Sequence, residues 1–352
     1  MKLGKIRGMA ITAGIGSPRV SRYSPWLSFL VALLIFMLGG TACSKETPTA
    51  PADKAAVGAP VTESASTPAT DTTSPDSGPL PQIDSKRTFQ YIKEIIAFGT
   101  RPIGSENHKK VENYITSHLK GDQVEDDAFT ADTVEGKFPV RNIIAKYPGT
   151  KDGIIVILGH YDTNYPLRDI GFVGANDGGS STAILLEYAN HLRGKKRDGY
   201  SVWLVWTDGE EAVRQWSETD SLYGTRHLAE KWEKDGTLKK IKALFVMDMI
   251  GDADLNIDRD TNSTPWLLDL VYQAAERSGV QSHFYARAGA MDDDHLPFVK
   301  RGVPSIDVID LDYGYNNVFH HTAQDTIDKL SPRSLEIVGN TVLEAIRMLD
   351  RR

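Results

Sequence analysis

The chain has 352 residues but only one cysteine. A single cysteine excludes an internal disulfide framework and a zinc site built from several thiolates. An excess of basic residues is also missing, because the formal net charge is −7, and this argues against a nucleic-acid partner. With 40% hydrophobic residues, the chain is too apolar to be wholly disordered. Any metal site would have to be built from histidine, aspartate and glutamate side chains.

The first 42 residues contain no acidic side chain and five basic ones. An apolar run from Trp26 to Leu38 follows the basic leader. It is shorter than the roughly 20 residues of a membrane-spanning helix and suits the core of a signal peptide. Small residues and then Cys43 come next, a pattern that resembles the lipobox of bacterial lipoproteins. We expect a lipoprotein signal peptide over residues 1–42 and lipidation of Cys43; the alternative is ordinary secretion, with Cys43 incidental.

The segment that follows Cys43 lacks aromatic side chains up to residue 80 and consists mostly of Ser, Thr, Pro, Ala and Asp. It cannot bury enough apolar surface to offset the entropy of ordering. We expect residues 43–84 to be a disordered tether and residues 85–352 to be the catalytic domain. Removal of the five basic residues of the leader would take the net charge from −7 to −12. Membrane anchoring would then depend on acyl chains on Cys43, and the chain would be an exported bacterial lipoprotein of the cell envelope, on its periplasmic side or cell surface.

Short apolar runs alternate with helical patterns after residue 85. The runs suit strands buried on both faces of a sheet, and they are Ile154–Leu158, Val202–Trp206, Ala243–Met247 and Val303–Ile309. Helices are expected over Lys86–Phe98, Glu106–Leu119, Ser181–Leu192, Tyr223–Trp232, Pro265–Ser278 and Leu335–Leu349. Residues 126–133 and 139–146 could add antiparallel strands at one edge. The alternation predicts an α/β fold, a three-layer sandwich with a central, mostly parallel mixed β-sheet flanked by helices.

Acidic and imidazole side chains gather where the predicted strands end and in the loops beside them. These groups are His160–Asp162, Asp177, Glu210–Glu211, Asp248 and His320–His321. Each group alone is more often a surface turn or a solvated helix start. Together they fall where ligands bind in open α/β sheets, beyond the carboxyl ends of the strands. Because converging carboxylates repel one another without a cation, the joint pattern predicts a divalent metal site.

Seven sequence stretches occur in a characteristic order. They are Gly159–Thr163, Phe172–Asp177, Asp208–Ala212, Trp216–Ser217 with Asp220–Ala229, Asp248–Gly251, Asp293–Phe298 with Arg301–Pro304, and His321–Thr322. This order resembles the co-catalytic zinc aminopeptidase superfamily and, within it, the glutaminyl-peptide cyclotransferases (glutaminyl cyclases). The stretches beginning at Trp216 and Asp293 are specific to the cyclases. The resemblance covers roughly residues 87–350.

The resemblance implies an enzyme that converts N-terminal glutaminyl residues of peptides or proteins to pyroglutamyl residues and releases ammonia. Asp177, Glu211 and His321 would hold one zinc ion, which would polarise the γ-carbonyl. Glu210 would act as the general acid/base and carry the proton from the attacking amine to the leaving nitrogen.

The resemblance also implies the surroundings of Glu210. Asp248 and Asp293 would hold it in a network of shared protons, and Trp216 and His320 would form the pocket wall. Animal cyclases usually have tryptophan at the position of His320, so this part of the wall differs.

A zinc aminopeptidase that hydrolyses N-terminal residues is the alternative. Its second zinc ion would bind His160 and Asp248, with Asp177 bridging the two metals. This chain has both of these second-metal ligand types, so residue identity leaves the number of zinc ions open. A binding module that has lost its metals is a third possibility, against which the retained acidic and imidazole residues argue.

Overall fold

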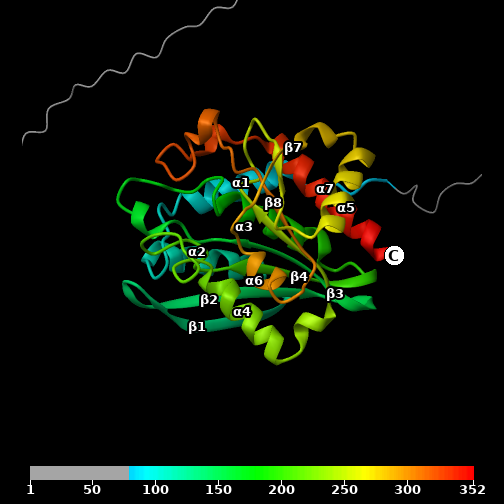
Figure 1. The fold of residues 1–352 in the computed structure, drawn as a ribbon, viewed down its shortest axis with the longest axis horizontal. Coiled ribbons are helices and arrows are strands. Elements are labelled where there is room, and N and C mark those ends of the chain that lie inside the picture. Colours follow the sequence, from blue (N-terminus) through cyan, green and yellow to red (C-terminus); the bar gives the residue numbers. More distant parts are fainter. Residues whose placement is uncertain (1–78) are drawn as a thin grey trace, which may run out of the picture. The chain divides into compact units, whose positions relative to one another are not determined.

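The computed structural model describes residues 79–352 (Figure 1), so the predicted signal peptide, Cys43 and most of the predicted tether lie outside the described residues. The helices are α1 (Ser85–Ile96), α2 (Glu106–His118), α3 (Gly179–Leu192), α4 (Tyr223–Lys234), α5 (Pro265–Arg277), α6 (Leu296–Val299) and α7 (Pro332–Asp350). The strands are β1 (Gln123–Thr133), β2 (Gly136–Tyr147), β3 (Gly149–His160), β4 (Arg197–Thr207), β5 (Ile241–Asp248), β6 (Ile257–Asp260), β7 (Phe284–Gly289) and β8 (Ser305–Ile309).

Six strands form the central sheet in the order β1-β2-β4-β3-β5-β8. Strands β4, β3, β5 and β8 run parallel to one another, whereas β1 and β2 are antiparallel additions at one edge. The predicted α/β fold with a mostly parallel mixed sheet is therefore confirmed, together with the predicted antiparallel edge.

Strand β3 shows why helices cover both faces of the sheet (Figure 1). Ile155 and Ile157 pack in one apolar cluster with side chains of α1, α2, α3, α5 and α7. Ile154, Val156 and Leu158 point to the opposite face and pack with α4 and α6. Since successive side chains of a strand alternate between faces, a continuous apolar run requires two apolar layers. This arrangement is the predicted three-layer sandwich.

The described part of the chain begins just before α1 and is attached to the domain there. The side chain of Ile83 is buried, and the Asp84 carboxylate caps α1 by accepting a hydrogen bond from the backbone N–H of Arg87. Ile83 and Asp84, which were expected at the end of the tether, therefore belong to the folded part.

A second, two-stranded parallel sheet of β6 and β7 and the short helix α6 were not predicted. Strand β6 reads Ile-Asp-Arg-Asp, and the side chains of β7 are mostly half-buried or exposed. Neither strand therefore carries an apolar run. These elements flank the segment that contains Asp293.

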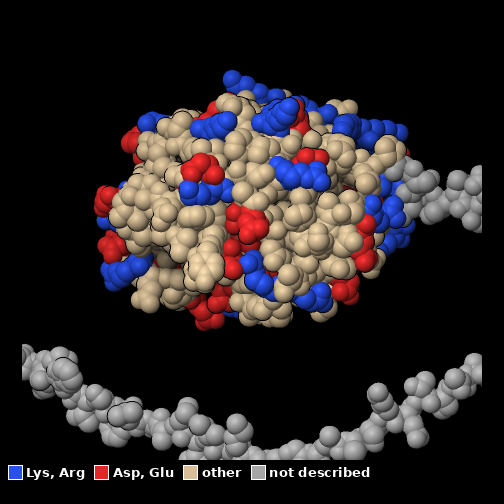
Figure 2. All heavy atoms as spheres, turned by 90° about the horizontal axis from the view of Figure 1, so that it is seen from above, with Lys and Arg blue, Asp and Glu red and all other residues tan. Residues whose placement is uncertain are grey.

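Basic and acidic side chains are interspersed on the face drawn in Figure 2, so this face has no continuous basic surface. Within residues 79–352, none of the helices combines the length and apolarity needed to cross a bilayer.

Candidate active site

Three neighbouring parallel strands, β4, β3 and β5, bring their carboxyl ends to one edge of the sheet. Strand β3 ends at His160 and β5 ends at Asp248, while Glu210 and Glu211 lie in the loop directly after β4. Asp177 lies in the loop that leads into α3. The structure therefore brings together the side chains that the sequence places at strand ends.

The loop that carries Asp177 approaches the end of β3 because a glycine follows it. Gly178 has a φ of +76°, and a Cβ atom there would lie 2.7 Å from the carbonyl oxygen of Asp162. The fully buried guanidinium of Arg101 holds the same loop by donating to the carbonyl oxygens of Gly174 and Asp177, at 2.9 and 3.3 Å. The glycine and the guanidinium together hold the backbone from which the Asp177 side chain extends.

Among the three predicted zinc ligands, His321 contacts both acids. The Nε2 atom of His321 is 3.2 Å from Asp177 Oδ2 and 3.3 Å from Glu211 Oε1. Ligands about 2.0–2.1 Å from a tetrahedral zinc ion would be separated by about 3.3 Å. His321 also has a φ of +53°, a strained backbone conformation for a non-glycine residue that is often found at functional sites.

Two buried oxygens in this cluster also fit a metal. Asp177 Oδ2 and Glu211 Oε1 accept no hydrogen bond, and each has only the ion-pair contact with His321 Nε2. Buried polar atoms are nearly always satisfied, so these two oxygens need positive charge, which protonated His321 or a bound cation can supply. Two carboxylates and one imidazole form a suitable donor set for zinc and leave an open position.

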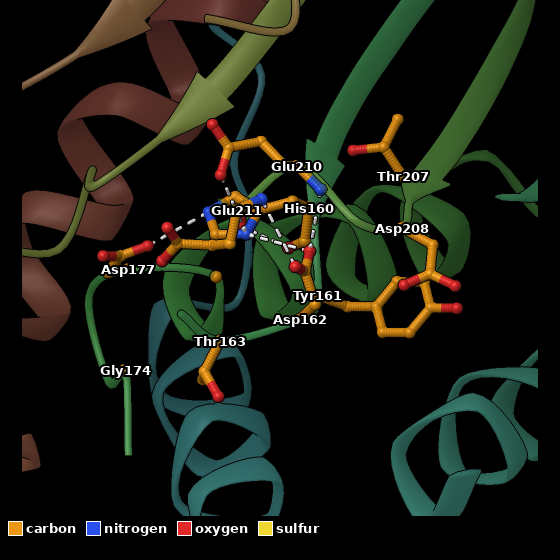
Figure 3. A network of polar contacts seen from close by, with 12 residues as sticks. His160, Tyr161, Asp162, Thr163, Gly174, Asp177, Thr207, Asp208, Glu210 and Glu211 are labelled. Atoms are coloured by element: carbon orange, nitrogen blue, oxygen red, sulfur yellow. Dashed lines mark hydrogen bonds and ion pairs between the residues drawn. The ribbon is translucent and has the colours of Figure 1, made fainter. Parts of the chain in front are cut away.

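His160 forms a second group with two of these acids, as Figure 3 shows for Asp177. Its Nε2 atom is 3.2 Å from both Asp177 Oδ1 and Asp248 Oδ1. Its buried Nδ1 atom makes no hydrogen bond, but Asp162 Oδ1 lies 3.6 Å and Glu210 Oε2 lies 3.9 Å away. His160, Asp177 and Asp248 are therefore placed to hold a second metal ion, as the aminopeptidase alternative requires.

His320 lies closer to the metal-ligand candidates than its predicted role in the pocket wall requires. Its Nε2 atom is 4.0 Å from Asp177 Oδ2, and ligand atoms of Asp177, His320 and His321 all lie within 4.8 Å of one another. Burial, together with the neighbouring His321, lowers the pKa of His320. A neutral imidazole is the form that binds metals.

The acidic groups of the site cannot all be ionised. Burial raises the pKa of Glu210 well above its ordinary value, and the charges of Glu211 and Asp293 raise it further. Burial and the charge of Asp248 raise the pKa of Asp293 well above its ordinary value. Some of these carboxyl groups must therefore hold or share protons.

The carboxylates around His321 favour its protonated form. Burial alone would lower the pKa of His321, but the carboxylates of Glu211 and Asp177 raise it to about 11. The cluster therefore attracts positive charge, which a bound divalent cation would supply instead.

A pocket of about 300 Å³ opens beside these groups. Of the predicted site residues, its lining includes Asp177, Glu210, Glu211, Trp216, Asp248, Asp293, His320 and His321. His160 does not line this pocket. The volume lies at the lower end of the range of about 300–1,000 Å³ for ligand pockets, which suits a single amino-acid residue.

Two residues beyond β3 hold Glu210 and Glu211 in place: Asn164, which was not predicted, and Asp162, which was predicted only as a member of the acidic group at this strand end. Asn164 donates a hydrogen bond of 2.8 Å to Glu211 Oε2. The Asp162 carboxylate accepts hydrogen bonds from the backbone N–H groups of Glu210 and Glu211, at 3.2 and 3.3 Å. Both residues belong to the segment that follows the end of β3, where a role was predicted only for His160.

Asp325 supports the opposite side of the cluster. Its carboxylate accepts hydrogen bonds from the backbone N–H groups of Asn176 and Asp177, at 2.8 and 3.2 Å. Tyr313 donates a hydrogen bond of 2.9 Å to the same carboxylate. No sequence signal marks this role, although Asp325 lies only four residues after His321.

The chain also resembles known proteins in sequence. A model of Peptidase family M28 matches residues 142–346. The glutaminyl-peptide cyclotransferase of Drosophila melanogaster is 33% identical in an alignment of 236 residues that covers 59% of this chain and 66% of that protein. The chain thus spans just under two thirds of this relative's length.

Solved structures also resemble the chain. The crystal structure of an Acidobacteriales bacterium glutaminyl cyclase has 52% sequence identity and a TM-score of 0.77, covering 78% of this chain and 98% of the other. A Zn-dependent exopeptidase from Parabacteroides distasonis has 25% identity and a TM-score of 0.68, covering 78% of this chain and all of the other. The resemblance inferred from the sequence motifs is confirmed.

Proposed function

The chain belongs to peptidase family M28, and within this family we propose that it is a zinc-dependent glutaminyl-peptide cyclotransferase. It would convert N-terminal glutaminyl residues of peptides to pyroglutamyl residues and release ammonia. One observation carries the proposal: Glu210, with its raised pKa, lines the same small pocket as Asp177, Glu211 and His321. The similarity to glutaminyl cyclases supports it.

Asp177, Glu211 and His321 would hold one zinc ion, since the two acids have buried oxygens that accept no hydrogen bond and since the distances from His321 to both acids fit ligands of a shared cation. When bound, the zinc ion would supply Lewis-acid polarisation of the substrate's γ-carbonyl group. Asn164 and Asp162 would keep Glu211 in place through their hydrogen bonds.

The chain's own residues would orient the substrate and move one proton. The α-amine of the substrate attacks its own γ-carboxamide, which closes a five-membered lactam and breaks the bond to the amide nitrogen. The small pocket favours the one side-chain conformer that brings these groups together. Glu210 takes a proton from the attacking amine and delivers it to the departing nitrogen, which leaves as ammonia.

Asp248 and Asp293 would tune Glu210 for this transfer. The charge of Asp293 raises the pKa of Glu210, and burial and Asp248 raise the pKa of Asp293 itself. A general acid/base works best when its pKa lies near the working pH. An upward shift for Glu210 serves this purpose.

A second candidate function is that of a zinc aminopeptidase. The observation that favours it is the set of His160, Asp177 and Asp248, whose ligand atoms lie within 4.8 Å of one another. With two zinc ions bound, Glu210 would act as general base toward a water molecule instead of the substrate's amine. One zinc ion per chain is expected for the cyclase and two for the aminopeptidase.

One experiment distinguishes these functions. The purified chain, supplied with zinc, is incubated separately with a peptide that begins with glutamine and with leucine amide. Release of ammonia and loss of its mass from the peptide, without any free amino acid, supports the cyclase. Free leucine supports the aminopeptidase. A folded chain that turns over neither substrate would refute both.

We also propose that the chain is exported and anchored to a membrane by lipidation of Cys43. This proposal rests on the sequence before residue 44, namely the basic leader, the apolar run and the small residues that precede Cys43. In a bacterial host that processes lipoproteins, Cys43→Ser should release active enzyme from the membrane fraction. Unchanged membrane association would refute the lipid anchor.

A further inference from the structure

We call the pocket of about 300 Å³ beside Glu210 and the predicted zinc ligands the reaction pocket, and a second cavity adjoins it. This second cavity has a volume of about 740 Å³ and is bordered by β1, the loop between β4 and α4, α4 itself and the region of α6. We call it the outer groove. Trp216 and Asp292 line both cavities, so the outer groove begins where the reaction pocket ends.

The substrate of the proposed function must extend beyond the reaction pocket. About 300 Å³ suffices for the reacting glutaminyl residue but not for the peptide attached to it. The remaining chain has to leave through the mouth of the pocket. Since Trp216 and Asp292 line both cavities, the outer groove is the neighbouring surface that can receive it.

The groove has the surface expected of a peptide site. Its lining combines the rings of Phe129, Trp216 and Tyr223 with Leu296 and Pro297. Trp216 is 36% exposed, so its ring can be covered by a bound chain. Aromatic side chains provide apolar contact area with little loss of conformational entropy.

All but one of the charged side chains that line the groove have a hydrogen-bond or ion-pair partner. Lys300 pairs with Glu218 at 3.3 Å, Arg301 pairs with Glu233 at 3.1 Å, and Arg226 donates to the carbonyl oxygen of Ser221. The remaining charged residues of the lining, which are Asp132, His227 and Glu230, also have ion-pair partners.

Asp292 alone among these charged groups has no hydrogen bond or ion pair within residues 79–352, and it is exposed. The open charge at the boundary of the two cavities is thus negative.

We propose that the outer groove binds the peptide chain on the carboxyl side of the reactive glutaminyl residue, and that Asp292 favours a lysine or arginine directly after it. This inference rests on the proposed function. Asp292 lines the reaction pocket as well as the groove, so it faces the second residue of the substrate. The later residues of the peptide lie over the aromatic lining.

The test compares kcat/KM for Gln-Lys-Ala-Ala, Gln-Glu-Ala-Ala and glutamine amide, using the full chain with zinc. An exposed ion pair contributes at most about 1 kcal/mol, so the lysine peptide should exceed the glutamate peptide by about two- to fivefold. The preference should decrease with added salt. In Asp292→Asn the ratio should fall to about one.

A matched control removes a negative charge elsewhere. Asp269 is exposed on α5, on the face of the sheet opposite α4, and Asp269→Asn should keep the lysine preference. An equal loss for all three substrates in Asp292→Asn would overturn the inference, because Asp292 would then act on the reactive residue itself.

A second variant tests the groove without changing any charge. Thr130 is exposed on β1 and lines the groove, so Thr130→Trp should fill part of it. The ratio of the KM for Gln-Lys-Ala-Ala to the KM for glutamine amide should rise several-fold. An unchanged ratio would refute binding of the chain in the groove.

Glutamine amide also separates the two proposals. If glutamine amide is cyclised and kcat/KM does not depend on the sequence or length of the peptide substrate, only the groove inference fails. If no glutaminyl substrate is cyclised, the proposed function fails and the groove inference fails with it.

Discussion

His108, Glu112 and Asp208 form a buried cluster from the same side-chain types as the reaction pocket, but its polar atoms are paired. His108 Nε2 lies 2.7 Å from Asp208 Oδ1, and its Nδ1 lies 3.4 Å from Glu112 Oε1. Asp208 Oδ2 accepts a hydrogen bond of 2.7 Å from the backbone N–H of Arg141. Lys109 and Arg141 pair with the other oxygen of Glu112. This cluster does not line the reaction pocket.

In the candidate metal site of His160, Asp177, Glu211 and His321, by contrast, three buried ligand-type atoms make no hydrogen bond and have only ion-pair contacts. These are Asp177 Oδ2, Glu211 Oε1 and His160 Nδ1. Residue types and proximity are therefore insufficient to distinguish a metal site from a structural network. Unsatisfied buried atoms beside a cavity make the distinction, because leaving them unpaired costs free energy that a bound cation can offset.

The largest effect is expected at Glu210, the proposed general acid/base. Glu210→Gln should lower kcat by about 100- to 10,000-fold, because the amide cannot carry the proton. Zinc content, measured by elemental analysis, should stay the same, since Glu210 is not a proposed ligand. Equal loss of zinc and activity would contradict this division of roles.

Removal of a proposed ligand should instead reduce zinc binding. His321→Ala should weaken zinc binding by more than about 100-fold, the upper value for loss of a group that only orients a ligand. Zinc affinity can be measured by competition with a chelator. Unchanged affinity would remove His321 from the ligand set and weaken the contrast between the two clusters.

Asn164, which contacts the proposed ligand Glu211, should have an intermediate effect on zinc affinity. Asn164→Ala removes the hydrogen bond to Glu211 Oε2, so zinc affinity should fall by about 10- to 100-fold. Added zinc should restore most of the activity, which separates a positioning residue from a catalytic one. Failure of zinc to restore activity would show that Asn164 acts in another way.

The sheet was predictable because its strands need apolar side chains on both faces. The observed strands are longer than the predicted runs: Ile154–Leu158 is the centre of β3, which spans Gly149–His160. Residues 149–153 join the strand through backbone pairing with β4, and polar side chains do not reveal such pairing. The same reason explains why β6, with its sequence Ile-Asp-Arg-Asp, was missed.

The position of a candidate site residue was predictable where an acidic or imidazole side chain lies at a strand end or just after it, as at His160 and Glu210. It was not predictable where a role depends on a contact between distant segments. Asp325 meets the backbone of Asn176 across 149 positions of the chain. Asn164 meets Glu211 across 47 positions. Nothing in the local sequence specifies either pairing.

The smallest effect on activity is expected in the satisfied cluster. His108→Gln should lower the free energy of unfolding by about 1–3 kcal/mol through loss of buried hydrogen bonds, while zinc content remains that of the unmodified chain. Burial lowers the pKa of His108, but Asp208 more than offsets this and raises it above 6.5.

The stabilisation by protonated His108 is therefore fully present below pH 6.5 and is lost as the pH rises through the folded-state pKa. Urea unfolding should show the largest difference between the unmodified chain and the variant in mildly acidic solution. The difference should shrink as the solution becomes alkaline. A gap that widens with pH would mean that His108 is buried in its neutral form, and loss of zinc in the variant would mean that a paired cluster can also serve the metal site.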